Sequence, residues 1–197
     1  MSKLYFKYGA MGSSKTANLL ITKFNYEEKG KKVLLLKPSS DTRDGADMVR
    51  SRIGLEEKAF IIRENKSILD DWYEKIEVAD VILIDEAQFL SEEQVDELHE
   101  IVLRYGIPVI CYGLLTDFTS HLFPGSKRLV EISESLQEIK TICECGRKAT
   151  CNARFNEDGV ALLTGDQVVM GGNDMYKSMC YACWKKYTGY GKRQKSV

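Results

Sequence analysis

An eight-residue stretch near the start of the chain constrains the fold more than any other feature of the sequence. It lies between an apolar run at residues 4–8 and apolar residues at helical spacing, and it reads Gly9-Ala10-Met11-Gly12-Ser13-Ser14-Lys15-Thr16. A strand, a loop of small residues, Lys-Thr and a helix are the context of a phosphate-binding P-loop. A surface turn of small residues is the alternative. The stretch predicts that backbone N–H groups and Lys15 bind nucleotide phosphates and that the Thr16 hydroxyl binds Mg²⁺.

One position departs from the P-loop pattern, which has Gly immediately before the Lys. Ser14 occupies this position. A Cβ beside the phosphates could crowd them, but a residue in right-handed helical conformation does not need to be Gly. We therefore expect Ser14 to begin the helix in that right-handed conformation, with its N–H directed at the phosphates. If Ser14 instead displaces the phosphates, the chain is a nucleotide-sensing protein that kept the cleft and lost catalysis.

Short apolar runs alternate with segments of helical spacing over the first two thirds of the chain. The runs at 33–36 and 81–84 are apolar throughout, which is typical of strands buried on both faces of a parallel sheet. The alternation predicts an α/β fold with a doubly wound parallel sheet of the P-loop NTPase type, and 197 residues suffice for one such core with a small appendage. Strands are expected at 4–8, 33–36, 59–62, 81–84 and 107–112, and helices at 15–29, 67–76 and 91–105.

A polar segment, residues 37–54, follows the second apolar run and contains Asp41 and Arg43. Ligands of such sheets bind beyond the carboxyl ends of the strands. The segment is therefore either part of the ligand site or a mobile, solvated surface loop.

Two acids, Asp85 and Glu86, end the apolar run at 81–84. In P-loop proteins an acid at this strand end holds Mg²⁺, usually through water, so Asp85 is expected to join Thr16 as a magnesium ligand. Glu86 faces elsewhere and is free to act on a substrate hydroxyl. Helix-capping acids are the alternative, which the preceding P-loop disfavours.

Charge and cysteine content restrict the classes of protein to which this chain can belong. With 28 Lys and Arg against 29 Asp and Glu, the formal net charge is −1, so we expect no surface for nucleic acids or membranes. No apolar run is long enough to span a bilayer, and the N-terminus lacks the apolar region of a signal peptide. The sequence therefore predicts a cytoplasmic protein, whose six cysteines are reduced thiols more suited to metal than to disulfides.

The last part of the chain loses the helical pattern and contains paired cysteines. Cys143 and Cys145 form the first pair, and Cys180 and Cys183 form the second. Four thiolates suit a closed, tetrahedral, structural Zn²⁺. Because the first pair is one residue shorter than C-x-x-C, Cys151 could replace one of its members, and a hairpin without metal is the alternative.

These features divide the chain into three expected segments. Residues 1–138 form the P-loop α/β domain, and residues 139–186 form a zinc-binding domain with a long loop pinned at its base. Residues 187–197 are rich in Gly, Lys and Arg and are expected to form a flexible tail.

Several motifs occur in a characteristic order: the P-loop, Asp41-Thr42-Arg43, Asp85-Glu86-Ala87-Gln88-Phe89, Gly113-Leu114, Thr116-Asp117-Phe118, Phe123, the cysteine pairs, and Val168-Val169-Met170-Gly171-Gly172 with Tyr176. This set, spread over about residues 3–185, resembles the cytosolic-type, zinc-containing thymidine kinase family. Members of that family are tetrameric and occur in animals and many bacteria.

The resemblance implies an ATP-dependent kinase with Glu86 as the base that takes the proton from the thymidine 5′-hydroxyl. Asp41 and Arg43 would lie near the phosphates or that hydroxyl. It also implies a homotetramer, with thymidine triphosphate binding the same cleft as a feedback ligand. The residues implied to line the thymine pocket are Met11, Phe89, Leu114, Phe118 and Phe123, and those implied to close over the base as a lasso are Val168, Val169, Met170, Gly171, Gly172 and Tyr176.

The chain departs from the family pattern at Ser14, at the tight Cys143-x-Cys145 pair, and at Leu115 and Thr119, where bacterial members often carry basic residues. Besides the sensing protein, the rival hypothesis is a zinc-ribbon protein that binds nucleic acid. The balanced charge and the lack of a basic, aromatic ribbon disfavour that rival.

Overall fold

The computed structural model describes residues 2–41, 45, 47–165, 167 and 175–191. At its centre six parallel strands lie in the order β5-β2-β6-β7-β1-β8. This confirms the α/β class and the parallel sheet. The strands are β1 (Leu4–Tyr8), β2 (Val33–Pro38), β5 (Phe60–Ile62), β6 (Val81–Ile84), β7 (Val109–Gly113) and β8 (Ser135–Glu138), and the helices of this region are α1 (Lys15–Glu27), α2 (Ile68–Ile76), the 3₁₀ turn η1 (Ala87–Phe89), α3 (Glu92–Tyr105) and α4 (Pro124–Ile132).

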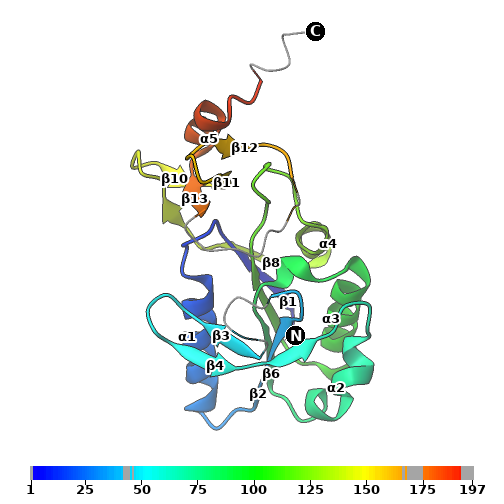
Figure 1. Ribbon diagram of the computed structural model, residues 1–197. Coiled ribbons are helices and arrows are strands. Elements are labelled where there is room, and N and C mark those ends of the chain that lie inside the picture. Colours follow the sequence, from blue (N-terminus) through cyan, green and yellow to red (C-terminus); the bar gives the residue numbers. More distant parts are fainter. Residues whose placement is uncertain (1, 42–44, 46, 166, 168–174, 192–197) are drawn as a thin grey trace.

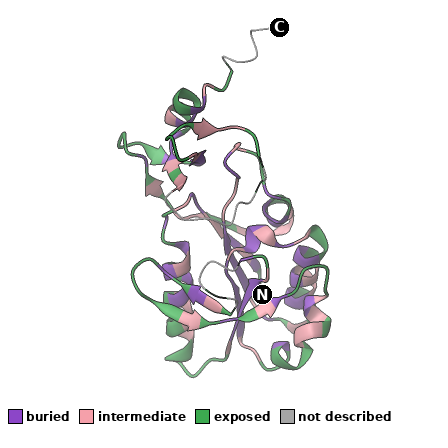
Figure 2. Cartoon of the chain, in the orientation of Figure 1, coloured by how far each residue is buried: buried purple, intermediate pink, exposed green. Residues whose placement is uncertain are grey.

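The central strands send alternate residues to the two faces of the sheet. Leu34 and Ile82 pack into a core that contains residues of α2, α3 and α4, whereas Leu35 and Leu83 pack into a second core with residues of α1. Figure 1 shows α1 on one side of the sheet and α2 and α3 on the other, and Figure 2 shows the buried strands between them. Helices cover both faces, which explains why these runs are apolar throughout.

The helix ends follow local capping chemistry. The Ser91 hydroxyl accepts a hydrogen bond from Gln94 N–H, and the Gln94 side chain accepts one from Ser91 N–H, so the expected capping box precedes α3. Gly106, with φ of 64°, ends the same helix. The side chain of Ser67 caps α2 through Asp70 N–H. α1 ends at Glu27, two residues before the expected end at residue 29.

The polar segment 37–54 is not one loop, contrary to expectation. Its second half enters an antiparallel hairpin of β3 (Met48–Arg50) and β4 (Glu56–Lys58), in which Val49 packs into the core beside α1. The sequence did not indicate this hairpin, because three-residue strands are too short to show periodicity.

A smaller part of the molecule stands beyond the carboxyl ends of the parallel strands (Figure 1). Its elements are β9 (Thr141–Ile142), β10 (Lys148–Ala149), β11 (Cys151–Phe155), β12 (Ala161–Leu162), β13 (Tyr176–Met179) and α5 (Tyr181–Thr188). The sequence missed α5, which is too short for a periodic pattern and includes the first two residues of the expected flexible tail. Among the described residues, no helix combines the length and the apolar character that a membrane span requires.

Candidate active site and metal centre

The chemical motifs of the first part of the chain meet at one edge of the sheet. The P-loop follows β1, Asp85 and Glu86 follow β6, and Leu114 follows β7. These three strands are neighbours in the order β6-β7-β1, and all are parallel, so their carboxyl ends lie side by side. A ligand site at this edge is the arrangement that open α/β sheets favour.

Ser14 adopts the left-handed conformation, with φ of 62° and ψ of 29°, and immediately precedes α1. The expectation of a right-handed Ser14 is therefore wrong. The chain must turn sharply between β1 and α1, and Gly12, with φ of 72°, is left-handed as well. The Gly of the P-loop pattern is thus explained by backbone conformation, because an L-residue with a Cβ is disfavoured there by about 1–2 kcal/mol.

The Lys15 side chain is buried beneath the loop. Its ammonium donates hydrogen bonds to the carbonyl oxygens of Gly9 (3.1 Å) and Ala10 (3.0 Å), and it lies 3.5 Å from Ser13 Oγ. The loop therefore keeps a positive charge at the N-terminus of α1, where the helix dipole also favours an anion.

The two residues expected to bind Mg²⁺ are in direct contact. The Thr16 hydroxyl donates a hydrogen bond to Asp85 Oδ2 at 3.0 Å. Burial, together with the neighbouring Glu86, raises the pKa of Asp85 to about 7, although Thr16 and Lys15 act in the opposite direction. A buried carboxyl whose charged form is disfavoured, beside a hydroxyl, fits a divalent cation, because the ion supplies the missing positive charge.

Glu86 is half-buried and left-handed, with φ of 50°. Its Oε2 accepts a hydrogen bond of 2.5 Å from Nε2 of Gln88, whose own Oε1 accepts one of 2.9 Å from Leu114 N–H. A Cβ at Gly113 would lie 2.7 Å from that Oε1, so the absence of a side chain there admits Gln88. Gln88 thus links the carboxylate of Glu86 to the end of β7.

Sequence reasoning did not select Gln88 as a site residue, although it stands within the quoted motif. An amide between an acid and an aromatic residue gives no chemical signal of its own. Its buried position, 1% exposed, and its two partners become visible only in the folded chain.

The aromatic residues expected around the base lie close to the same edge. The rings of Phe89 and Phe123 pack edge to face with centroids 5.8 Å apart. Phe118 is buried, and the guanidinium carbon of Arg154 lies 3.8 Å from its ring centroid. Leu114 is half-buried at the end of β7. One face of Phe118 is therefore already covered by a side chain that the sequence did not connect with the site.

Asp41 is buried and forms an ion pair of 3.1 Å with Lys37, a lysine with no exposed side-chain surface. The Lys37 ammonium also donates to the carbonyl oxygen of Met48 at 2.9 Å. It thereby fastens the polar segment to the end of β2. Arg43, the second residue expected here, lies outside the described residues.

Asn152 on β11 connects the smaller part of the molecule to the P-loop. Its Oδ1 accepts a hydrogen bond from Met11 N–H at 2.8 Å, and its Nδ2 donates to Thr116 O at 3.2 Å. The residue is 3% exposed. The sequence gave no signal for it, because the contact joins positions separated by 141 residues.

The expected lasso is only partly described. Val168, Val169, Met170, Gly171 and Gly172 lie outside the described residues. Tyr176 is half-buried at the start of β13, opposite Arg154 on β11. Gln167, just before the segment, donates a hydrogen bond to Asp117 Oδ2 at 3.0 Å. Gln167 therefore lies against the loop that follows β7.

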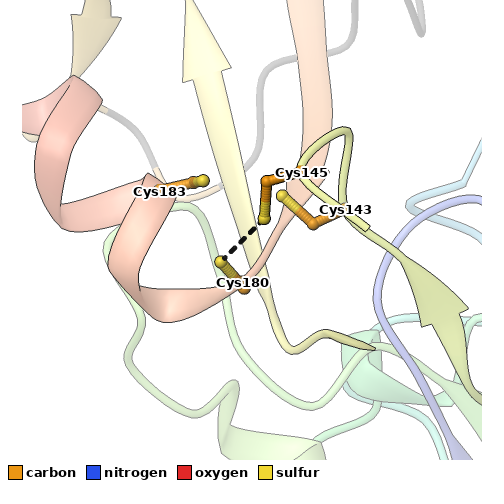
Figure 3. A group of neighbouring side chains, drawn as sticks. All are labelled: Cys143, Cys145, Cys180 and Cys183. Atoms are coloured by element: carbon orange, nitrogen blue, oxygen red, sulfur yellow. Dashed lines mark hydrogen bonds between the residues drawn. The ribbon is translucent and has the colours of Figure 1, made fainter. Parts of the chain in front are cut away.

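The two cysteine pairs converge, as Figure 3 shows. The sulfurs of Cys143, Cys145, Cys180 and Cys183 all lie within 4.8 Å of one another, and the Cys145 and Cys180 sulfurs are 3.6 Å apart. Sulfurs around a tetrahedral Zn²⁺ with Zn–S bonds of about 2.3 Å lie about 3.8 Å apart, so the cluster fits this ion. Cys151 is buried but is not part of the cluster.

The protonation of the cluster also suits a cation. Backbone N–H groups of Cys145 and Cys180 lower the pKa of the Cys143 thiol to about 7. The neighbouring sulfurs raise the pKa of Cys183 to about 12. Four thiolates at this distance repel one another, and a divalent cation removes that repulsion.

Comparisons with known proteins agree with this geometry. The sequence matches the thymidine kinase family over residues 2–184. Thymidine kinase of Vibrio parahaemolyticus is 45% identical over 191 residues, which cover 96% of this chain and all of the relative. Thymidine kinase of Enterobacteria phage T4 is 44% identical over 95% of this chain and 98% of the relative, and that of Haemophilus influenzae is 43% identical over 96% and 99%. From residue 2 to residue 184, the chain belongs to the thymidine kinase family.

Proposed function

We propose that this protein transfers the γ-phosphoryl group of ATP to the 5′-hydroxyl of thymidine, giving ADP and thymidine monophosphate. The observation that carries the proposal is the contact of Thr16, in the first turn of α1, with Asp85, which follows β6 directly beside Glu86. The relatives named thymidine kinase, which align over nearly their whole length, support the choice of substrate.

The P-loop is proposed to bind the β- and γ-phosphates through the amides of Gly9, Ala10, Met11, Gly12, Ser13 and Ser14 and through Lys15 and Thr16. Lys15 would exchange its carbonyl acceptors for phosphate oxygens, which are charged and bind an ammonium more strongly. Thr16 and Asp85 are the residues that would hold Mg²⁺, which neutralises charge across the phosphates. Positioning and charge stabilisation supply most of the catalysis in such a transfer.

Glu86 is proposed to be the general base. Its carboxylate would accept the proton of the 5′-hydroxyl while the oxygen attacks the phosphoryl group. Gln88 holds one carboxylate oxygen, which restricts the orientation of the base. Asp41 and Arg43 are proposed to lie near the phosphates or the 5′-hydroxyl.

The thymine base is proposed to lie between two sets of residues. Met11, Phe89, Leu114, Phe118 and Phe123 would line the pocket, and residues 168–172 with Tyr176 would close over the base. The edge-to-face packing of Phe89 on Phe123 supports an aromatic pocket at this place.

The cysteine cluster is proposed to hold one structural Zn²⁺ through Cys143, Cys145, Cys180 and Cys183. We further propose that residues 1–138 carry the phosphoryl chemistry and that residues 139–186 complete the thymidine site. A homotetramer in the cytoplasm, with feedback by thymidine triphosphate and no membrane or nucleic-acid partner, completes the proposal.

One assay tests the proposal directly. The purified protein is incubated with thymidine, ATP and Mg²⁺, and thymidine monophosphate is measured, with deoxycytidine as the control acceptor. Formation of thymidine monophosphate at about one turnover per second or more is expected, since kinases typically turn over about 1–100 times per second. Binding of ATP without any transfer would favour the nucleotide-sensing alternative, which the left-handed Ser14 motivates.

A further inference from the structure

The β3–β4 hairpin brings an arginine to the P-loop. A Cβ built on Gly12 would lie 3.7 Å from Nη1 of Arg52, which is an ordinary van der Waals distance. Arg52 belongs to the turn between β3 and β4, and Gly12 belongs to the middle of the P-loop. The guanidinium thus lies beside the backbone that is proposed to surround the phosphates.

We propose that Arg52 binds the phosphates held by the P-loop and stabilises the phosphoryl group during its transfer. The inference rests on the proposed function and adds Arg52 to the cations proposed there, Lys15 and Arg43. It assigns this cation to the hairpin, which packs on the α1 side of the molecule.

The hairpin is built to hold its turn in place. Ser51 N–H donates to Leu55 O at 2.7 Å, and Leu55 N–H donates back to Ser51 Oγ at 3.0 Å. Gly54, with φ of 88°, closes the turn through a hydrogen bond to Ser51 O. Lys23 on α1 forms an ion pair of 2.9 Å with Glu57 on β4. These contacts restrict the hairpin, so Arg52 starts from a defined backbone position.

Arg52 differs from its neighbour Arg50 in having no acidic partner among the described residues. Arg50 pairs with Glu56 across the hairpin at 2.9 Å. In the described part of the chain, Arg52 forms no ion pair and no hydrogen bond, and its side chain is exposed. If Arg52 only stabilised the fold, we would expect it to have an acidic partner, as Arg50 has in Glu56. An exposed guanidinium beside an anion-binding loop is instead available for an incoming phosphate.

The chemistry of the guanidinium suits this role better than that of an ammonium. Arginine presents several N–H donors in a planar fork that matches two phosphate oxygens at once. An arginine supplied in this way to a transferred phosphoryl group accelerates other P-loop enzymes by about 10³–10⁵-fold. Lys15, by comparison, is buried and carries a single ammonium group, which donates to the carbonyl oxygens of Gly9 and Ala10.

The test compares Arg52→Gln with Arg50→Gln, a matched loss of one charge on the same hairpin. We expect Arg52→Gln to lower kcat by about 10³-fold, with little change in the KM for thymidine, and Arg50→Gln to leave kcat within about threefold. The kcat of Arg52→Lys should lie between those of the two Gln variants, because lysine keeps the charge but lacks the planar fork of N–H donors. Unchanged melting temperatures would show that both variants are folded. A kcat for Arg52→Gln that equals that of Arg50→Gln would overturn the inference.

A second measurement does not depend on turnover. Isothermal calorimetry with Mg·ATP and with ADP should show that Arg52→Gln weakens ATP binding by about tenfold or more, and that Arg50→Gln does not. Equal affinities in both variants and the wild type would contradict a phosphate contact. If the wild type binds ATP through Arg52 but never phosphorylates thymidine, the proposed function fails and the phosphate contact of Arg52 stands.

Discussion

The region of the parallel sheet and the cysteine-bearing region of the molecule are each stabilised by different kinds of buried side chain. Around the sheet the buried side chains are mostly long aliphatic ones, such as Leu36, Ile84 and Leu98. Around the C-terminal strands they are mostly alanines and cysteines, together with Met179 and Trp184. Burial of large apolar side chains stabilises a fold by about 1.5–3 kcal/mol each, and small ones contribute less. We infer that the second region depends on the Zn²⁺ proposed for its four cysteines, whereas the first region does not depend on it.

Function divides in the same way. The first region supplies the P-loop, Asp85 and Glu86, and Asn152 of the second region bonds the P-loop at Met11 N–H and the segment after β7 at Thr116 O. Disorder caused by loss of the proposed metal can therefore reach the P-loop through this contact. The comparison therefore predicts which substitutions affect only one region and which affect both.

Loss of the metal should have the largest effect. The protein is expected to contain about one Zn²⁺ per chain, and Cys180→Ser should release it, since structural zinc contributes about 10–16 kcal/mol to the folding of small domains. Elemental analysis measures the metal. Amide exchange should then show lost protection in residues 141–165 and 175–188 and retained protection in the parallel sheet.

Cys151→Ser is the matched control, because Cys151 is buried nearby but lies outside the four-sulfur cluster. It should retain the metal. If Cys151→Ser loses the metal and Cys143→Ser retains it, the metal ligand is Cys151 and not Cys143.

The next largest effect is expected at Glu86. Glu86→Gln keeps the shape of the side chain but cannot accept a proton, so kcat should fall by about 10²–10⁴-fold. Thymidine binding, measured by calorimetry, should persist, and the metal content should not change. Glu92→Gln, on the exposed first turn of α3, serves as the control for the loss of one charge. Normal turnover of Glu86→Gln would exclude Glu86 as the base.

Asn152→Ala tests the connection between the regions. It leaves the half-buried Met11 N–H without its acceptor, and loss of a buried partner costs about 1–3 kcal/mol. We expect kcat/KM to fall by roughly tenfold while zinc is retained. Asn156→Ala, which removes only a hydrogen bond within a nearby turn, is the control. Equal activities of the two variants would show that the P-loop does not depend on the second region.

The smallest effect concerns Ser14 and stays within the first region. Because Ser14 is left-handed, Ser14→Gly should relieve strain and raise the free energy of unfolding by about 1 kcal/mol. The same change at Ser133, with φ of −70°, relieves no such strain and adds chain entropy, so it should stabilise the protein less than Ser14→Gly does. Thermal unfolding of both variants checks the order. Destabilisation by Ser14→Gly would mean that Ser14 is not left-handed in solution.

The sequence by itself determined most of the framework. Continuous apolar runs predicted the buried strands β1, β2, β6 and β7, because side chains on both faces of a parallel sheet must be apolar. Capping residues predicted the start of α3, and the two cysteine pairs predicted the cluster of four sulfurs. All of these signals are local, so they can be read from neighbouring letters in the chain.

Tertiary structure alone decided the contacts that join distant segments. Gln88 meets Leu114, Asn152 meets Met11, and Arg52 approaches Gly12, and in each case an ordinary polar residue acquires a role from what folds against it. The left-handed Ser14 belongs here too, since its conformation follows from the path that the chain must take between β1 and α1. Local propensity cannot reveal such roles, because a hydrogen bond across 141 residues depends on the whole fold and not on the residues beside it.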